Sequence, residues 1–114
     1  DQSQFVGNLD WICRKNEQRQ IKTLFVLEPN SIENEPEVDK FLRLKHEEVR
    51  TVAKRYNVPV VEMHDYLQEN HQRGFLWWDY VHLTSYGHSV FADRLLEEIE
   101  QVIATERQPE GNRQ

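Results

Sequence analysis

The sequence has 114 residues, the size of one compact domain, and leaves no room for two separate cores. Its 14 Lys and Arg residues against 20 Asp and Glu residues give a formal net charge of −6, which argues against nucleic acid as a partner. With 38% hydrophobic residues and only four Gly and four Pro, the chain can form a core. The single cysteine, Cys13, excludes an internal disulfide, and no apolar run approaches the roughly 18 residues of a membrane span.

The first half of the chain shows helical and extended patterns in turn. Apolar residues recur at helical spacing over residues 5–18, which predicts an amphipathic helix with Cys13 as an inert thiol on its buried face. The run 21–27 is rich in β-branched and aromatic residues and ends before Pro29, so we expect a buried strand. Pro36 suits the first position of a helix whose 3.6-residue period continues to Tyr56.

The second half repeats this order. Residues 58–63 form another short apolar run, entered through Pro59, and predict a second buried strand. Residues 64–70 predict a short helix, and a longer final helix is expected over residues 84–105, with Thr84 as its N-cap. Residues 107–114 are expected to be a disordered polar tail.

Helices alternating with strands predict an α/β fold: a three-layer α/β/α sandwich with a parallel sheet, of flavodoxin-like type. Two strands make a poor sheet, because each leaves an exposed edge and isolated pairs are marginal in water. We therefore expect strands to be missing, so that residues 1–106 are the C-terminal half of a domain of roughly 200 residues. The chain also opens at Asp1 without an initiator Met, which fits a piece of a longer protein.

A carboxylate stands three residues before an imidazole in the loop ahead of the final helix. A turn of that length can bring Asp79 and His82 together, so that the carboxylate accepts the Nδ1 proton and Nε2 is free to take a proton from a nucleophile. The pair predicts a general base with its orienting residue. The alternative is that His82 only caps the following helix or packs in the loop.

The string over residues 78–92, WDYVHLTSYGHSVFA, resembles the last conserved block of the SGNH, or GDSL, hydrolases. In that family an Asp-x-x-His-Leu/Pro-x-x-x-Gly pattern leads into a C-terminal helix, and its Asp and His complete a Ser-His-Asp triad. Asp79 and His82 match those positions, and Gly87 matches the family's small residue in the first helical turn. The resemblance covers roughly residues 5–103 and implies a serine esterase of the SGNH hydrolase type, with no metal and no organic cofactor.

The nucleophile of that family is missing from this sequence. The family carries it in a Gly-Asp-Ser motif, and the serines here lie in neither such a motif nor a Gly-x-Ser-x-Gly elbow: Ser3, Ser31, Ser85 and Ser89. The family's Gly-x-Asn-Asp motif is also missing, since residues 7–10 hold similar letters in the wrong order within a helical pattern. The resemblance therefore implies that a missing N-terminal half supplies the serine.

Trp77 and Trp78 directly precede Asp79 and are predicted to form the lip of a substrate pocket, with core packing as the alternative. The implied substrate is a carboxylic ester, and the aromatic pair favours a small acyl group on a carbohydrate over a lipid. No metal site is predicted, because the spacing of the histidines matches no His-Glu-x-x-His pattern: His64, His71, His82 and His88.

Two hypotheses of another class remain beside the esterase. In the first, the chain is a non-catalytic piece that self-associates, or pairs with its missing half, through an exposed sheet edge. A small flavodoxin-like signalling domain is less favoured, because it needs five strands and the sequence shows two.

Overall fold

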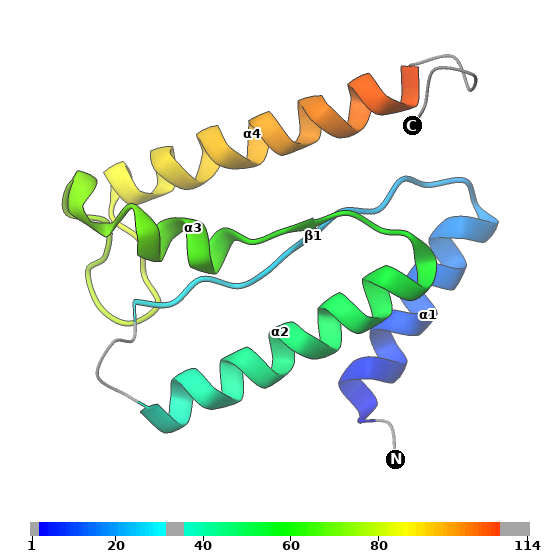
Figure 1. Ribbon diagram of the computed structural model, residues 1–114, viewed down its shortest axis with the longest axis horizontal. Helices are drawn as coiled ribbons and strands as arrows, with labels where there is room; N and C mark the ends of the chain where they lie inside the picture. Colours follow the sequence, from blue (N-terminus) through cyan, green and yellow to red (C-terminus); the bar gives the residue numbers. More distant parts are fainter. Residues whose placement is uncertain (1–2, 32–35, 108–114) are drawn as a thin grey trace.

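The computed structural model of the protein describes residues 3–31 and 36–107. In chain order its elements are α1 (Gln4–Gln18), β1 (Phe25–Val26), α2 (Pro36–Tyr56), β2 (Val60–Val61), α3 (Met63–Glu69), the 3-10 helix η1 (His71–Arg73) and α4 (Ser85–Arg107) (Figure 1). The two strands pair in parallel, with Phe25 opposite Val60 and Val26 opposite Val61. The predicted helices are confirmed in place and type, and each strand is confirmed as a shorter element within its predicted run.

The predicted three-layer α/β/α sandwich of flavodoxin-like type is wrong. The described residues form four α-helices and a single sheet of two strands, so the protein is mostly helical. The extended runs over residues 21–27 and 58–63 are reduced to two paired residues each. The physical reason is that each strand has only one neighbour, and a lone strand pair is held by few ladder hydrogen bonds. Of the predicted tail, Arg107 ends α4 and the rest lies outside the described residues.

Polar contacts fasten α1 to α2. One oxygen of the Asp10 carboxylate accepts hydrogen bonds from Arg55 at 2.9 Å and from the Tyr56 hydroxyl at 2.7 Å. Ser3, the N-cap of α1, donates to Glu48 of α2 at 2.9 Å. Asp10 thus has a structural role, in agreement with the helical assignment of residues 7–10.

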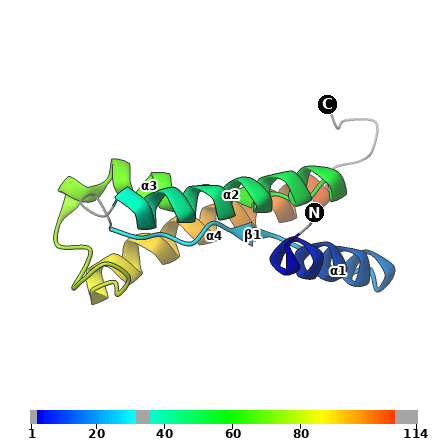
Figure 2. The same cartoon turned by 90° about the horizontal axis from the view of Figure 1, so that it is seen from below.

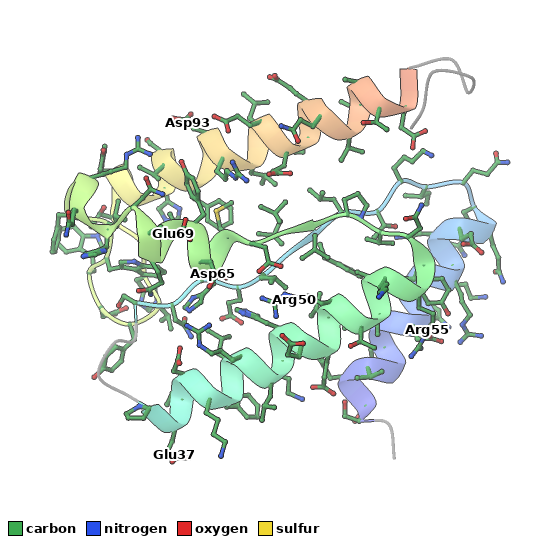
Figure 3. The ribbon with its side chains drawn as sticks, viewed as in Figure 1. Glu37, Arg50, Arg55, Asp65, Glu69 and Asp93 are labelled. Carbon is green, nitrogen blue, oxygen red and sulfur yellow. The ribbon has the colours of Figure 1, made fainter. Side chains whose placement is uncertain are left out.

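On the opposite side of α2, Arg50 holds the end of β2. Its guanidinium donates to both Glu62 oxygens, at 2.8 Å and 2.7 Å, and lies between α2 and the strand pair (Figure 3). The hydrogen bonds from Arg50 lower the pKa of Glu62, so this carboxylate stays ionised. Cys13 on α1 is buried, as predicted, and burial raises the pKa of its thiol.

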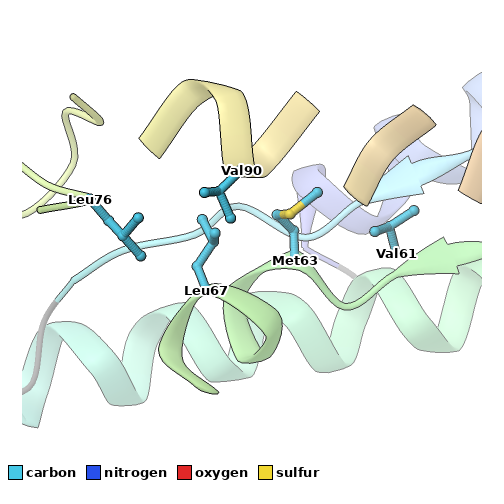
Figure 4. Packing of buried hydrophobic residues seen from close by; sticks show 5 residues of the cluster. All are labelled: Val61, Met63, Leu67, Leu76 and Val90. Carbon is cyan, nitrogen blue, oxygen red and sulfur yellow. The ribbon is translucent and has the colours of Figure 1, made fainter. Parts of the chain in front are cut away.

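The main apolar cluster lies between the strand pair, α3 and the first turns of α4 (Figure 4). Its buried members come from four separate segments: Val61, Met63, Leu67, Leu76 and Val90. Seen at right angles to Figure 1, the β1 segment passes between α2 and the start of α4 (Figure 2).

Within the described ranges, none of the helices is long and apolar enough to span a membrane.

The first turn of α4 packs directly on Leu76. Thr84 caps the helix as predicted: its hydroxyl accepts the Gly87 N–H at 2.9 Å and donates to the Phe75 carbonyl at 2.6 Å. A Cβ at position 87 would collide with the Leu76 carbonyl oxygen and lie 2.9 Å from a methyl group of Leu83. Close backbone approach, not backbone conformation, therefore requires glycine at this position.

Two glycine substitutions should have opposite effects on stability. Gly87→Ala should destabilise the protein by about 1–3 kcal/mol, because relieving the overlap with the Leu76 carbonyl forces α4 away from the backbone of Leu76. Gly7→Ala, inside α1 with open space around the new methyl group, should stabilise it by up to about 1 kcal/mol through helix propensity. Urea unfolding of both variants measures the difference, and equal stabilisation by the two alanines would contradict the packing of α4.

Candidate functional site

A small hairpin before α4 carries the predicted site residues. The Trp78 N–H donates to the His82 carbonyl at 2.8 Å, and Trp77 and Leu83 form an isolated antiparallel bridge. The Thr84 N–H donates to the Leu76 carbonyl at 2.9 Å and closes the base of the hairpin. These bonds place Asp79 and His82 at opposite ends of a tight turn, three residues apart, as the sequence predicts.

The Asp79 carboxylate organises this turn. Its Oδ1 accepts the Val81 N–H at 2.9 Å and the His82 N–H at 2.8 Å. The His82 Nδ1 lies 2.9 Å from Oδ1 and 2.8 Å from Oδ2. The Val81 amide, followed by the His82 ring and amide, lowers the pKa of Asp79 to about 2, so the carboxylate is ionised at neutral pH.

An ionised carboxylate can only accept hydrogen bonds, so Nδ1 of His82 must carry a proton. In the neutral ring the unprotonated nitrogen is then Nε2, the atom that a general base uses. The His82 side chain is 73% exposed, which leaves the ring accessible from solvent. The predicted contact between Asp79 and His82 is confirmed as geometry, while its role in catalysis stays a prediction.

Trp77 and Trp78 occupy different environments. Trp77 is half-buried and packs against the apolar cluster, whereas Trp78 is 70% exposed and meets Phe75 edge to face, with ring centroids 5.2 Å apart. Both line a pocket of about 300 Å³, together with Ser31, Asp79 and Tyr80. Both residues therefore line the pocket, and only Trp77 also packs against the core.

A larger hollow, of about 880 Å³, lies at the other end of the strands and is lined by residues such as Cys13, Pro59 and Val102. None of the predicted site residues lines it. We place the candidate site at the smaller pocket, because Asp79 lines it and is hydrogen bonded to His82, which is not itself one of the lining residues.

Ser31, which lies in no nucleophile motif, contributes to the site in a way that the sequence did not predict. Its N–H donates to the Tyr80 carbonyl at 2.9 Å, and its hydroxyl donates to the Asp79 carbonyl at 2.9 Å. The hydroxyl thus holds the turn and is not directed at the His82 ring. In the part of the chain that the structure describes, no serine hydroxyl is hydrogen bonded to His82. The available signal for Ser31 was its position just beyond the carboxyl end of a strand, where α/β sheets place ligands.

The other histidines do not join this pair. His46 and His64 are buried beside each other, with ring centroids 5.5 Å apart, whereas His71 and His88 are exposed. Among residues 3–31 and 36–107, no three His, Cys, Asp or Glu side chains are grouped so that they could hold a metal ion.

Comparisons with protein-family models, with curated proteins and with solved structures found no match to this chain. The candidate site therefore stands on its own geometry.

The proton on His82 Nδ1 is directly measurable. Long-range ¹⁵N NMR should show that the neutral form of the His82 ring carries its proton on Nδ1. In Asp79→Asn the amide oxygen should keep the backbone N–H bonds, so the amide nitrogen faces Nδ1 and the proton moves to Nε2. A wild-type ring with its proton on Nε2 would contradict the geometry.

Acid should weaken the turn in a defined pH window. An unfolded Asp has a pKa of about 3.9, and the folded pKa of Asp79 is lowered to about 2. The ionised carboxylate thus contributes stability above about pH 4 that is lost as the pH falls from about 4 to about 2. The difference in unfolding free energy between wild type and Asp79→Asn should shrink as the pH falls through that window. A difference that persists unchanged to the acid end would contradict this assignment.

Proposed function

We propose that Asp79 and His82 are the general base of a serine ester hydrolase that resembles the SGNH, or GDSL, type. The observation that carries the proposal is the contact of both Asp79 oxygens with Nδ1 of His82, in a ring that is exposed to solvent. This arrangement sets the tautomer, and the carboxylate stabilises the imidazolium that forms when Nε2 accepts a proton.

The reaction proceeds by transfer of an acyl group to a serine. Nε2 of His82 takes the hydroxyl proton while the serine oxygen attacks the ester carbonyl carbon. The resulting imidazolium gives that proton to the departing alcohol, and the carbon–oxygen bond of the ester breaks. Water, deprotonated by the same Nε2, then attacks the acyl carbon. The bond from this carbon to the serine oxygen breaks, the imidazolium returns the proton to that oxygen, and the acid leaves. Asp79 keeps the ring oriented through both steps.

The serine is expected from outside the described residues, as part of a missing N-terminal half or of a companion chain. The 73% exposure of His82 leaves room for such a partner to approach. The pocket lined by Trp77, Trp78 and Tyr80, of about 300 Å³, supports a carboxylic ester with a small acyl group as substrate, because aromatic faces stack on sugar rings and bury acyl groups. A carbohydrate ester is favoured over a lipid ester.

A non-catalytic role is the second candidate, and the sheet supports it. Within the described ranges β1 pairs with β2 alone, so its second edge is not paired with another strand. A strand from a second copy, or from the missing half, would pair there by backbone hydrogen bonds.

Ester turnover by the protein with its native partners, using 4-nitrophenyl acetate and an acetylated sugar, tests the hydrolase. His82→Ala should lower turnover by at least about 10²-fold, the usual worth of a general base. It should leave the unfolding free energy nearly unchanged, because a contact between two exposed side chains contributes little.

His88→Ala is the matched control. It removes another exposed histidine, which lies in the first turns of α4, and it should leave turnover unchanged. Full activity of His82→Ala would exclude the proposed base. Failure of wild type to cleave either ester, with a dimeric mass by light scattering, would favour strand pairing instead.

A further inference from the structure

Two side chains of α3 hold the backbone of Asn30. The Asn30 N–H donates to Nδ1 of His64 at 3.1 Å, and the Asn30 carbonyl accepts from the Gln68 side chain at 2.6 Å. Both His64 and Asn30 are buried, at 2% and 6% exposure. The Asn30 N–H therefore depends on a side chain that lies 34 residues away in the sequence.

The next residue carries this contact to the candidate site. The Ser31 N–H and hydroxyl bind the carbonyl oxygens of Tyr80 and Asp79, each at 2.9 Å. Asp79 in turn orients His82. Two sets of hydrogen bonds, joined by the backbone of residues 30–31, thus connect the ring of His64 to the turn that holds the proposed base.

His64 can serve as the acceptor only while it is neutral. Its Nδ1 receives the Asn30 proton, so in the neutral ring the proton is on Nε2, which lies 3.9 Å from Asp39. A protonated imidazole carries N–H groups at both nitrogens and has no acceptor. Protonation would leave the buried Asn30 N–H without its partner and place two N–H groups against each other.

The surroundings of His64 set where this proton binds. Burial lowers its pKa, and the neighbouring His46 and Arg43 of α2 act in the same direction. Asp65 of α3 and Asp39 of α2 oppose them. The folded protein therefore keeps His64 neutral to a lower pH than an exposed histidine.

We propose that neutral His64 is a positioning residue for the Asp79–His82 turn, and that its protonation releases Asn30, Ser31 and this turn from α3. The consequence for catalysis rests on the proposed function, whereas the release itself is a property of the fold. In the open form His64 is solvated and binds its proton near pH 6.5, so the ratio of closed to open forms should fall by up to about tenfold per pH unit below this value.

Amide hydrogen exchange tests the release without any activity measurement. The reporter is the Ser31 N–H, with the exchange rate corrected for its intrinsic pH dependence, and the reference is the Leu67 N–H in the buried part of α3. Between about pH 7.5 and about pH 4.5, protection of Ser31 should fall by at least about tenfold while that of Leu67 stays constant.

Three variants separate His64 from other causes. Asn Oδ1 stands three bonds from Cα, like Nδ1 of His, so His64→Asn keeps the acceptor without the titration and should be protected at all pH values. His64→Leu has no acceptor and should be unprotected at all pH values. His46→Gln retains an Nε2 donor for the Glu28 carbonyl, which His46 Nε2 contacts at 3.0 Å, and should keep the wild-type pH dependence.

Three results would overturn the proposal. They are a flat wild-type profile for Ser31, a His64→Asn profile as steep as wild type, and a parallel loss of protection at Leu67, which would mean global unfolding. None of these results bears on ester turnover, so the positioning role and the hydrolase can fail separately.

Discussion

The close approach of Leu76 to the first turn of α4 is the contact on which the rest of the site depends. Leu76 is a buried member of the apolar cluster, and its carbonyl oxygen also accepts the Thr84 N–H. The glycine at position 87 permits this approach. Core packing, the start of α4 and the closing of the hairpin therefore all depend on the position of Leu76. Asp79 and His82 meet in the turn of this hairpin.

Within that turn the Asp79 carboxylate accepts the hydrogen bonds that fix the position of His82. Asp79 accepts two backbone N–H groups and the ring N–H of His82, which explains both its low pKa and the tautomer that we infer for the ring. The arrangement is local, since all the donors lie within three residues. The turn needs no hydrogen bond from a third strand. Although the described residues form only a two-stranded sheet, Asp79 and His82 are therefore still held in contact.

The local parts of the structure could be predicted from the sequence, and the long-range parts could not. Apolar spacing located the helices, and the threonine before the last helix identified its cap. The three-residue spacing predicted that Asp79 and His82 meet, because a tight turn allows few other arrangements. The prediction of a three-layer sandwich was wrong because the pairing of a strand depends on neighbouring strands, which a short stretch of sequence does not reveal. His64 and Asn30 were missed for the same reason: their hydrogen bond joins residues 34 positions apart.

In the proposed mechanism His82 activates a serine. We would therefore first treat the purified sample with a serine-reactive phosphonate and measure the intact masses of every chain present. We expect a phosphonate adduct on a serine of a companion chain or of a longer form of this chain, and its loss in His82→Ala. A sample that contains only the 114-residue species, with no adduct on any chain, would contradict it.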